Sequence, residues 1–405
     1  MITYTVSIDK TEYDQFVEQH PYGNLLQGSK WSQVKDNWQS QYLAFYQDQD
    51  LVAGACVLIR TIAANFRVAY IPRGPVVDYS NQDLVQEVFS VLQQYAKKER
   101  FLLLKCDPSL LFDRTNPKQV ATCEQVIASI EKTGAIWSGL TFDLSDTVQP
   151  RFQANKHLTP ESIEDYQKHV KRLIKTARKK GVDISQGHAN EVQVFADLIA
   201  LTEQRKQIHL RNYDYFNKIK TIYGDKAEFY FAKIDIAKQL KQQKDRLQQL
   251  TDDLAATPDH QKNRIKNLNQ QITATQKQAA ELAELAQHYP NELVIAGVLG
   301  IRFATGIELL YAGMNNQFKH YYPQYLLNTE IFKTCYQNGL TWANMGGVEG
   351  KLDGGLSTFK LSFKPTIDEY IGEFNLPSNK WLYKFGKKAY SFYKKQKSLR
   401  RQKNA

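Results

Sequence analysis

The sequence lacks the motifs of several familiar catalytic chemistries. It has no G-x-G-x-x-G turn, no phosphate-binding P-loop, no G-x-S-x-G nucleophile elbow and no Cys/His spacing of a metal site, and its eight histidines are dispersed. These absences argue against nucleophilic triads and metal-dependent hydrolysis. Carboxylates, tyrosines and cations remain, and these suit substrate positioning and charge stabilisation more than covalent catalysis.

Cysteines and long apolar runs are also scarce. The four cysteines stand without paired spacing, which is typical of reduced thiols that act as small hydrophobic residues. No uncharged apolar run of about 18 residues occurs, and the N-terminus MITYTVSIDK lacks the apolar core of a signal peptide. We therefore expect a protein that stays in the cytoplasm.

Charge of one sign is abundant. The formal net charge of the chain is +11, which favours polyanionic partners such as nucleic acid, phosphorylated metabolites or an anionic membrane surface. The segment 380–403 holds ten Lys or Arg, no acid and six aromatic residues. It reads either as a helix on a membrane or on RNA phosphates, or as a C-terminal helix packed on its own domain with a solvated basic face.

The hydrophobic periodicity predicts a mixed α/β fold in two copies. A chain of 405 residues exceeds what one core usually supports. Antiparallel strands are predicted over 42–60 and 67–77, then an amphipathic helix over 81–100 and a buried strand over 101–108. The same order returns in the second half, as strands over 229–235, 291–303 and GIELLYAGMN, a helix over 322–340 and the strand TWANMGG.

The second copy differs by an insertion of about fifty residues, 236–288. Its apolar residues keep 3/4 spacing on both sides of a break at Pro258, which predicts an antiparallel coiled-coil hairpin with arms of roughly 30 Å. Such an arm either touches a large partner or is a rigid insertion that packs on the body or on a second copy.

Several single residues are candidates for a site. Asp107 ends a buried strand before Pro108, where it serves function or caps the following turn. Arg211 and Tyr215 are four apart, so on a helix they share a face and offer a phosphate fork beside a phenol; a surface arginine on an aromatic patch is the alternative.

Three further positions carry weaker signals. Lys35 lies on a predicted helix lined by tryptophans, and Tyr311 ends a predicted strand, so each is a rim residue or a core residue. Gly346 and Gly347 make a glycine-rich turn where backbone can approach a ligand closely.

The stretch GGLSTFKLSFKP alternates apolar and polar residues from Phe359 to Lys364. This alternation predicts a half-buried strand with Lys360 on its cationic face. Lys360 is then either a solvated surface lysine or a cation aimed at a negatively charged substrate.

The paired α/β units, the motifs YPQYLL and NMGGVEGKLDGGLSTFKLSFKP and the helical insertion together resemble the Fem family of aminoacyl-tRNA-dependent peptidoglycan aminoacyltransferases, over nearly the whole chain. The resemblance implies two tandem acetyltransferase-like (GNAT) domains. The first covers 1–150 and is completed by 372–405, and the second covers 151–371 with the coiled-coil arm 236–288 inserted. The acyl-coenzyme-A signature R/Q-x-x-G-x-G/A is absent, so we expect no cofactor.

The implied reaction moves an amino acid (Ala, Ser or Gly) from aminoacyl-tRNA to the lysine side-chain amine, or growing bridge, of a peptidoglycan precursor. The acceptor is a lipid-linked or UDP-linked muramyl pentapeptide. The basic tail and the arm would then hold tRNA or contact the inner face of the membrane, and the sequence does not choose between these uses.

The resemblance also assigns roles to the candidate residues. Lys35, Arg211 and Tyr215 match positions that bind the phosphates and sugar of the precursor, and Tyr311 matches another cleft position. Asp107 matches the acid proposed to accept the proton of the amine. Lys360 matches a lysine expected at the tRNA end and at the developing oxyanion.

Two other classes compete with this interpretation. One is an N-acyltransferase that uses a coenzyme A thioester, against which the missing pyrophosphate loop argues. The other is a non-catalytic scaffold that binds tRNA or a membrane. The presence of all six matched cleft residues argues against a scaffold whose cleft has decayed.

Overall fold

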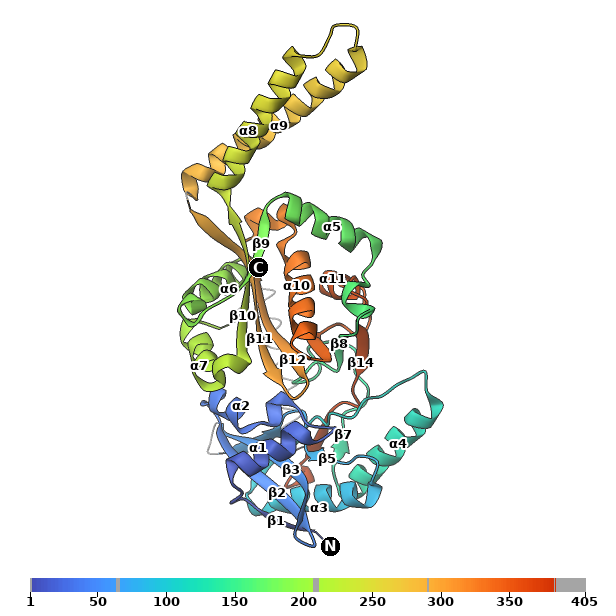
Figure 1. Cartoon of the computed structure of the whole chain (residues 1–405). Helices are drawn as coiled ribbons and strands as arrows, with labels where there is room; N and C mark the ends of the chain where they lie inside the picture. Colours follow the sequence, from blue (N-terminus) through green and yellow to red (C-terminus); the bar gives the residue numbers. More distant parts are fainter. Residues whose placement is uncertain (1, 63–65, 207–210, 290, 382, 384–405) are drawn as a thin grey trace, which may run out of the picture. The chain divides into compact units, whose positions relative to one another are not determined.

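A computed structural model describes residues 2–62, 66–206, 211–289, 291–381 and 383 (Figure 1). The predicted mixed α/β class is confirmed, with two sheets. The predicted use of the basic tail falls mainly on residues 384–405, which lie outside the described residues. Among the residues that the structure describes, no helix is long and apolar enough to span a membrane.

The first sheet has the strand order β1-β2-β3-β4-β6-β15-β7, with β5 paired to β3. Its strands are β1 Thr3–Thr5, β2 Gln39–Gln47, β3 Asp50–Thr61, β4 Arg67–Ile71, β5 Val76–Val77, β6 Phe101–Cys106, β7 Ile136–Trp137 and β15 Phe374–Leu376. Strands β2, β3 and β4 form the predicted antiparallel ladder, and β6 adds to β4 in parallel. Strand β15, from near the end of the chain, pairs with β6 and β7.

Helices α1 Lys10–Gln19, α2 Ser29–Val34, α3 Gln82–Lys98 and α4 Pro117–Lys132 accompany this sheet. The α3 helix forms because its apolar residues recur at helical spacing and Asn81 caps its first turn. Its buried stripe, with Val85, Phe89 and Leu92, joins Phe374 of β15 in one hydrophobic core. Strand β15 therefore completes the core that the N-terminal residues begin.

The second sheet has the order β14-β8-β13-β12-β11-β10-β9. Its strands are β8 Phe152–His157, β9 Val182–Gln186, β10 Ala227–Asp235, β11 Glu292–Phe303, β12 Gly306–Met314, β13 Trp342–Gly347 and β14 Thr366–Glu369. Its helices are α5 Lys168–Lys179, α6 Val192–Lys206, α7 Tyr213–Tyr223, α10 Pro323–Gln337 and α11 Gly355–Leu361. Short 3₁₀ turns are Leu25–Gln27, Ser162–Glu164, Ala189–Glu191, Gly224–Lys226 and Asn316–Tyr321.

Internal contacts divide the chain into two units. Unit 1 comprises Met1–His157, Arg302–Glu308 and Trp342–Ala405, and unit 2 comprises Leu158–Ile301 and Leu309–Thr341. Residues 342–371, which the prediction gave to the second domain, fall in unit 1. The domain bounds given above stay a prediction.

Two helices occupy the insertion in unit 2, α8 Ile236–Ala255 and α9 Lys262–His288, and they pack on each other. The buried positions Leu250, Leu268 and Leu282 belong to the apolar set whose spacing predicted the hairpin. The helices are therefore where the sequence placed them, while their supercoiling as a coiled coil stays a prediction.

The strand predicted from Phe359 to Lys364 is wrong. The chain there forms helix α11, followed by a turn. Ser357, Lys360 and Phe363 are buried, three residues apart, which is a helical period. The apparent alternation misled because it placed Lys360 and Ser362 on a solvent face, whereas both are buried.

Candidate active site

Lys360 is a buried lysine in α11, with 8 % of its surface exposed. Its Nζ donates a hydrogen bond of 2.8 Å to the carbonyl oxygen of Gly347, at the end of β13. Burial disfavours the charged form and lowers the pKa of Lys360 to about 8. The expectation of a cation on a solvated strand face is corrected: this is an ammonium held against backbone in a mostly dry position.

Gly346 and Gly347 form the end of β13 beside this lysine. Gly346 has a φ of +81°, and its N–H donates to the Oδ1 of Asn344 over 2.8 Å. A Cβ on Gly347 would lie 2.5 Å from the Cβ of Pro150, so only glycine fits there. In the structure the backbone at Gly347 approaches Pro150 of the same chain closely. The predicted close approach of this backbone to a ligand stays a prediction.

Asp107 lies directly after β6 and is 2 % exposed. It accepts hydrogen bonds from the phenol of Tyr70 at 2.9 Å and from the backbone N–H of Arg73 at 2.8 Å. The Arg73 guanidinium is 3.9 Å away. Burial raises the pKa of Asp107 to about 6, against the opposing effect of Arg73. These contacts make Asp107 an anchor for Arg73, and its role as a proton acceptor stays a prediction.

Lys35 follows the last residue of α2 in unit 1. Its ammonium lies 4.6 Å from the centre of the Trp31 ring, a cation–π contact with one of the tryptophans that lined the predicted helix. The side chain is half-buried. This position suits a cation on the rim of a site, while binding of a phosphate stays a prediction.

Arg211, Tyr215 and Tyr311 meet in unit 2. The Tyr311 phenol donates to the Tyr215 oxygen over 3.1 Å, and the Arg211 guanidinium lies 4.8 Å from the Tyr215 ring centre. Burial is the main effect that raises the pKa of Tyr215, and the neighbouring Tyr311 phenol raises it further. Arg211 precedes the N-cap Asn212 of α7, so the predicted shared helix face is wrong, although the two side chains do touch.

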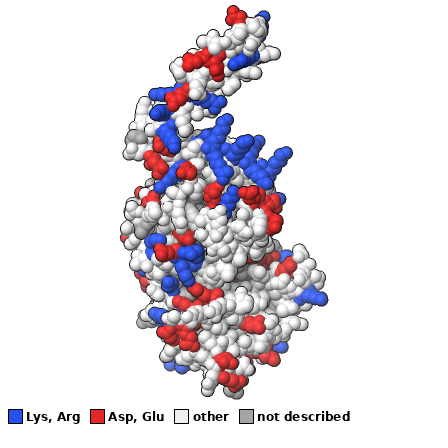
Figure 2. Space-filling view, in the orientation of Figure 1, with Lys and Arg blue, Asp and Glu red and all other residues white. Residues whose placement is uncertain are grey.

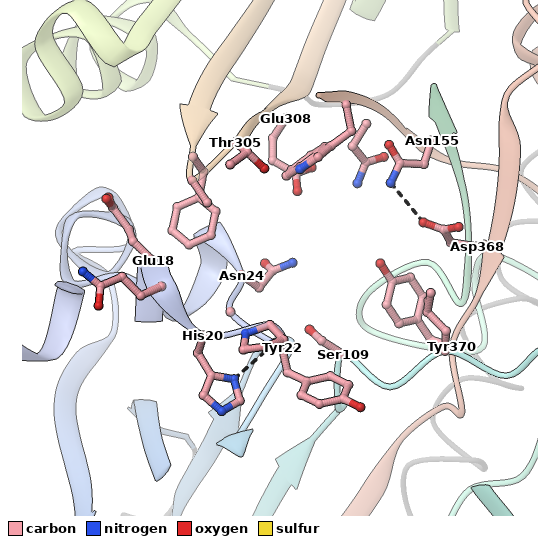
Figure 3. Close-up of a pocket in the computed structure, with 18 residues that line it drawn as sticks. Glu18, His20, Tyr22, Asn24, Ser109, Asn155, Thr305, Glu308, Asp368 and Tyr370 are labelled. Carbon is pink, nitrogen blue, oxygen red and sulfur yellow. Dashed lines mark hydrogen bonds between the residues drawn. The ribbon is translucent and has the colours of Figure 1, made fainter. Parts of the chain in front are cut away.

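A pocket of about 390 Å³ opens within unit 1, and the sequence did not predict it (Figure 3). This volume falls within the range of small-molecule sites, roughly 300–1,000 Å³. Figure 3 shows Glu308 and Asn155 on one side of the pocket and His20, Asn24 and Ser109 on the other. Three carboxylates line it, Glu18, Glu308 and Asp368, and among the described residues that line it none is Lys or Arg.

Two of these carboxylates have raised pKa values. Burial raises the pKa of Glu308 to about 7, helped by Asp368 and opposed by Arg73 and by a hydrogen bond from Asn344. Burial also raises the pKa of Asp368, against a hydrogen bond of 3.0 Å from the Asn155 amide. The ionised forms of both acids are therefore costly in this pocket and would be favoured by a cation.

Strand pairing explains why these side chains converge. Glu308 of β12 lies opposite Asn344 of β13, and Asn344 lies opposite Asn155 of β8. Residues directly opposite on paired strands point to the same face of a sheet. The sheet therefore presents Glu308, Asn344 and Asn155 as one row.

The pocket and Asp107 share a neighbour. Tyr370 lines the pocket, and its ring centre lies 3.9 Å from the guanidinium carbon of Arg73, which in turn holds Asp107. None of the residues predicted for the site lines this pocket. A signal for Glu308 existed in the sequence, since an acid within the apolar strand GIELLYAG is unusual, but its neighbours come from segments far apart in the chain.

Residues 8–391 match the profile of the FemAB family. The chain belongs to this family. It is 25% identical over 401 residues to a Staphylococcus saprophyticus protein named Lipid II:glycine glycyltransferase, covering 93% of this chain and 94% of that protein. It is 27% identical over 400 residues to the Staphylococcus aureus protein Aminoacyltransferase FemA, covering 92% and 94%.

A solved structure shares the fold. The crystal structure of FemX superposes with a TM-score of 0.77 and 24% identity, covering 95% of this chain and 99% of that chain. The predicted family and the predicted acyltransferase class are confirmed.

Proposed function

We propose that this FemAB-family protein transfers an amino acid from aminoacyl-tRNA to an amine on the stem peptide of a lipid-linked peptidoglycan precursor. Family membership over 8–391 and relatives named for glycyl transfer to lipid II support the acceptor and the reaction class. One observation carries the chemistry, the buried ammonium of Lys360 at the end of β13.

Lys360 would stabilise the charge that develops in this reaction. When an amine attacks the ester carbonyl of a charged tRNA, the carbonyl oxygen becomes an oxyanion. An ammonium has three donors, and Gly347 is its one partner among the described residues, which leaves donors for the substrate. A fixed cation in a mostly dry position acts more strongly on an oxyanion than it would in water.

Arg211, Tyr215 and Tyr311 of unit 2 would hold a phosphate and the sugar of the acceptor. Lys35 of unit 1 is, taken by itself, a further candidate for binding a phosphate. Arginine can grip a phosphate through two parallel N–H donors. The contacts of Arg211 with Tyr215, and of Tyr215 with Tyr311, support a pre-arranged group, because each side chain is already oriented by its neighbour.

Helix α5 supports an RNA donor. It carries six Lys or Arg in twelve residues and no acid, and all six are exposed. Figure 2 shows Lys and Arg side chains gathered over this helix. Its apolar residues Val170, Ile174 and Ala177 are buried against the protein. A helix that lies on a membrane needs a free apolar face, so this charge pattern favours phosphates of RNA over a lipid surface.

The test is transfer of labelled glycine, alanine or serine from charged tRNA to lipid-linked and nucleotide-linked precursors that contain lysine. We expect transfer by the wild type to at least one acceptor and its loss in Lys360→Met. Lys351→Met, an exposed lysine in the turn before α11, serves as the matched control. Transfer from acetyl-coenzyme A, with none from charged tRNA, would contradict the proposal.

A further inference from the structure

The unit 1 pocket has a composition suited to a cation. Its lining carries three carboxylates, one histidine and, among the described residues, no Lys or Arg. A phosphate or carboxylate ligand would meet only repulsion from the charged groups of this lining. The phosphates of the precursor therefore belong elsewhere, and a different part of a substrate fits here.

We propose that this pocket binds the acceptor's primary ammonium group, and that Glu308 takes a proton from it before the amine attacks the ester. This inference rests on the proposed function and deepens it, because it names the place and the chemistry of the nucleophile. The acceptor amine is a lysine ε-amine or the terminal amine of a growing bridge.

The proton balance requires such a group. A lysine amine has an ordinary pKa of about 10.4, so at neutral pH it arrives protonated and cannot attack. Glu308 removes one proton, and the neutral amine then forms the C–N bond while the ester C–O bond breaks. The second proton of the amine goes to the departing ribose oxygen, and the proton on Glu308 is released to solvent.

Glu308 is placed to perform this step. It is half-buried in the pocket, is oriented by Asn344, and lies in a row with Asn155 across paired strands. The Oδ1 of Asn155 is buried without a hydrogen-bond partner among the described residues. A bound ammonium would pair with the carboxylates that line the pocket, which are costly in their ionised form without a cation.

Asp107 suits this role less well than Glu308. It is 2 % exposed, accepts two hydrogen bonds and does not line the pocket. Its carboxylate fixes Arg73, which packs on Tyr370 in the pocket wall. Asp107 is in this view a positioning residue, and the proton acceptor is Glu308.

The first experiment measures binding and needs no tRNA. Calorimetry compares two stem peptides, one with lysine at the acceptor position and one with norleucine, which keeps the length but lacks the amine. We expect the lysine peptide to bind the wild type about 10-fold more tightly, and the preference to vanish in Glu308→Gln. Glu124→Gln, an exposed acid on α4, is the charge-matched control. Equal binding of the two peptides to the wild type would overturn the proposal.

The second experiment follows transfer against pH. Glu308→Gln should lower kcat by about 100-fold near pH 7. The ratio of the wild-type rate to the variant rate should shrink as the pH of the solution approaches the pKa of the free amine, because the amine then loses its proton to solvent. The charged groups that act on Glu308 are Arg73 and Asp368, and Glu18 and His20 line the same pocket. Asp368 helps to raise the pKa of Glu308, so Asp368→Asn, run in parallel, should keep the rise of rate with pH and move it to lower pH. A ratio that stays constant with pH, or a defect confined to the KM for tRNA, would overturn the assignment.

These two readouts separate the inference from the proposed function. Loss of all tRNA-dependent transfer, together with an intact preference for the lysine peptide, would contradict the reaction and support the ammonium pocket. Competition by alanine methyl ester, with no competition by the lysine peptide, would instead assign the pocket to the donor's ammonium and overturn the proposal.

Discussion

Two regions of the molecule carry opposite charge. The unit 1 pocket is lined by three acids and, among its described lining residues, no Lys or Arg, whereas α5 in unit 2 has six cations and no acid. The net charge of +11 therefore does not describe the part of the surface that meets each substrate. The contrast matches the two reactants proposed here, since a nucleophilic amine is a cation and a charged tRNA is a polyanion.

The largest effect is expected at Lys360, which belongs to neither region. Lys360→Met should reduce single-turnover transfer by about 100- to 1,000-fold, the cost of losing one donor to an oxyanion. Methionine fills a similar volume in a buried position, so the substitution should change the free energy of unfolding by less than about 1.5 kcal/mol. Thermal unfolding measures this change. Wild-type transfer rates in a folded Lys360→Met protein would refute the assignment.

The pH dependence sharpens the comparison within the site. Glu308 must be ionised to accept a proton, so kcat should rise with pH through about 7. Lys360 must be protonated to stabilise an oxyanion, so kcat should fall as pH rises through about 8. We expect a narrow bell for the wild type, and in Glu308→Gln we expect the rising limb to move from about 7 towards the pKa of the free amine. A flat profile from pH 6 to 9 would show that neither group titrates in the rate-limiting step.

Neutralising α5 tests the basic side of the comparison. Replacing Lys171, Arg172 and Lys175 by glutamine should raise the KM for charged tRNA about 10-fold. The association constant for tRNA should also depend less on salt, so that the slope of its logarithm against log salt becomes less negative by roughly 2. The KM for the precursor should stay unchanged. The control replaces Lys97, Lys98 and Lys132, which are exposed in unit 1. An equal effect of both triples would mean that α5 has no special part in binding.

The smallest effect is expected at the phenol pair of unit 2. Tyr311→Phe removes the hydrogen bond to Tyr215, which is worth about 1 kcal/mol. The KM for the precursor should rise about 3- to 5-fold with little change in kcat. A cycle with Tyr215→Phe measures the coupling, and additive effects of the two substitutions would show that the pair does not act as a unit.

The helices and strands that could be predicted from the sequence are those whose apolar residues recur with one clear period. The antiparallel ladder of β2 and β3, helix α3, strand β6 and helix α10 lie near their predicted positions, because each has an apolar repeat of one clear period. The strand predicted around Lys360 was wrong because the alternating run from Phe359 to Lys364 is short enough to fit both a strand period and a helical period. Its burial is decided by tertiary contacts with β13, which the local pattern does not contain.

The site was predicted only in part, for a related reason. The resemblance supplied Lys35, Asp107, Arg211, Tyr215, Tyr311 and Lys360, and the structure adds contacts among some of them. The pocket is assembled from β8, β12, β13 and β14, the ends of α1 and β11, and the segments after α1 and β6, and its lining residues range from Glu18 to Tyr370. Register between strands brings Glu308, Asn344 and Asn155 together, and no pattern within one segment encodes that register.

The most direct test of the central claim is a transfer assay with charged tRNA and lipid-linked precursor, in which the acceptor lysine is present or replaced by norleucine. We expect labelled amino acid to appear on the lysine-containing precursor alone, with wild-type protein and not with Lys360→Met. Transfer to the norleucine-containing precursor, or transfer that survives in Lys360→Met, would contradict the account.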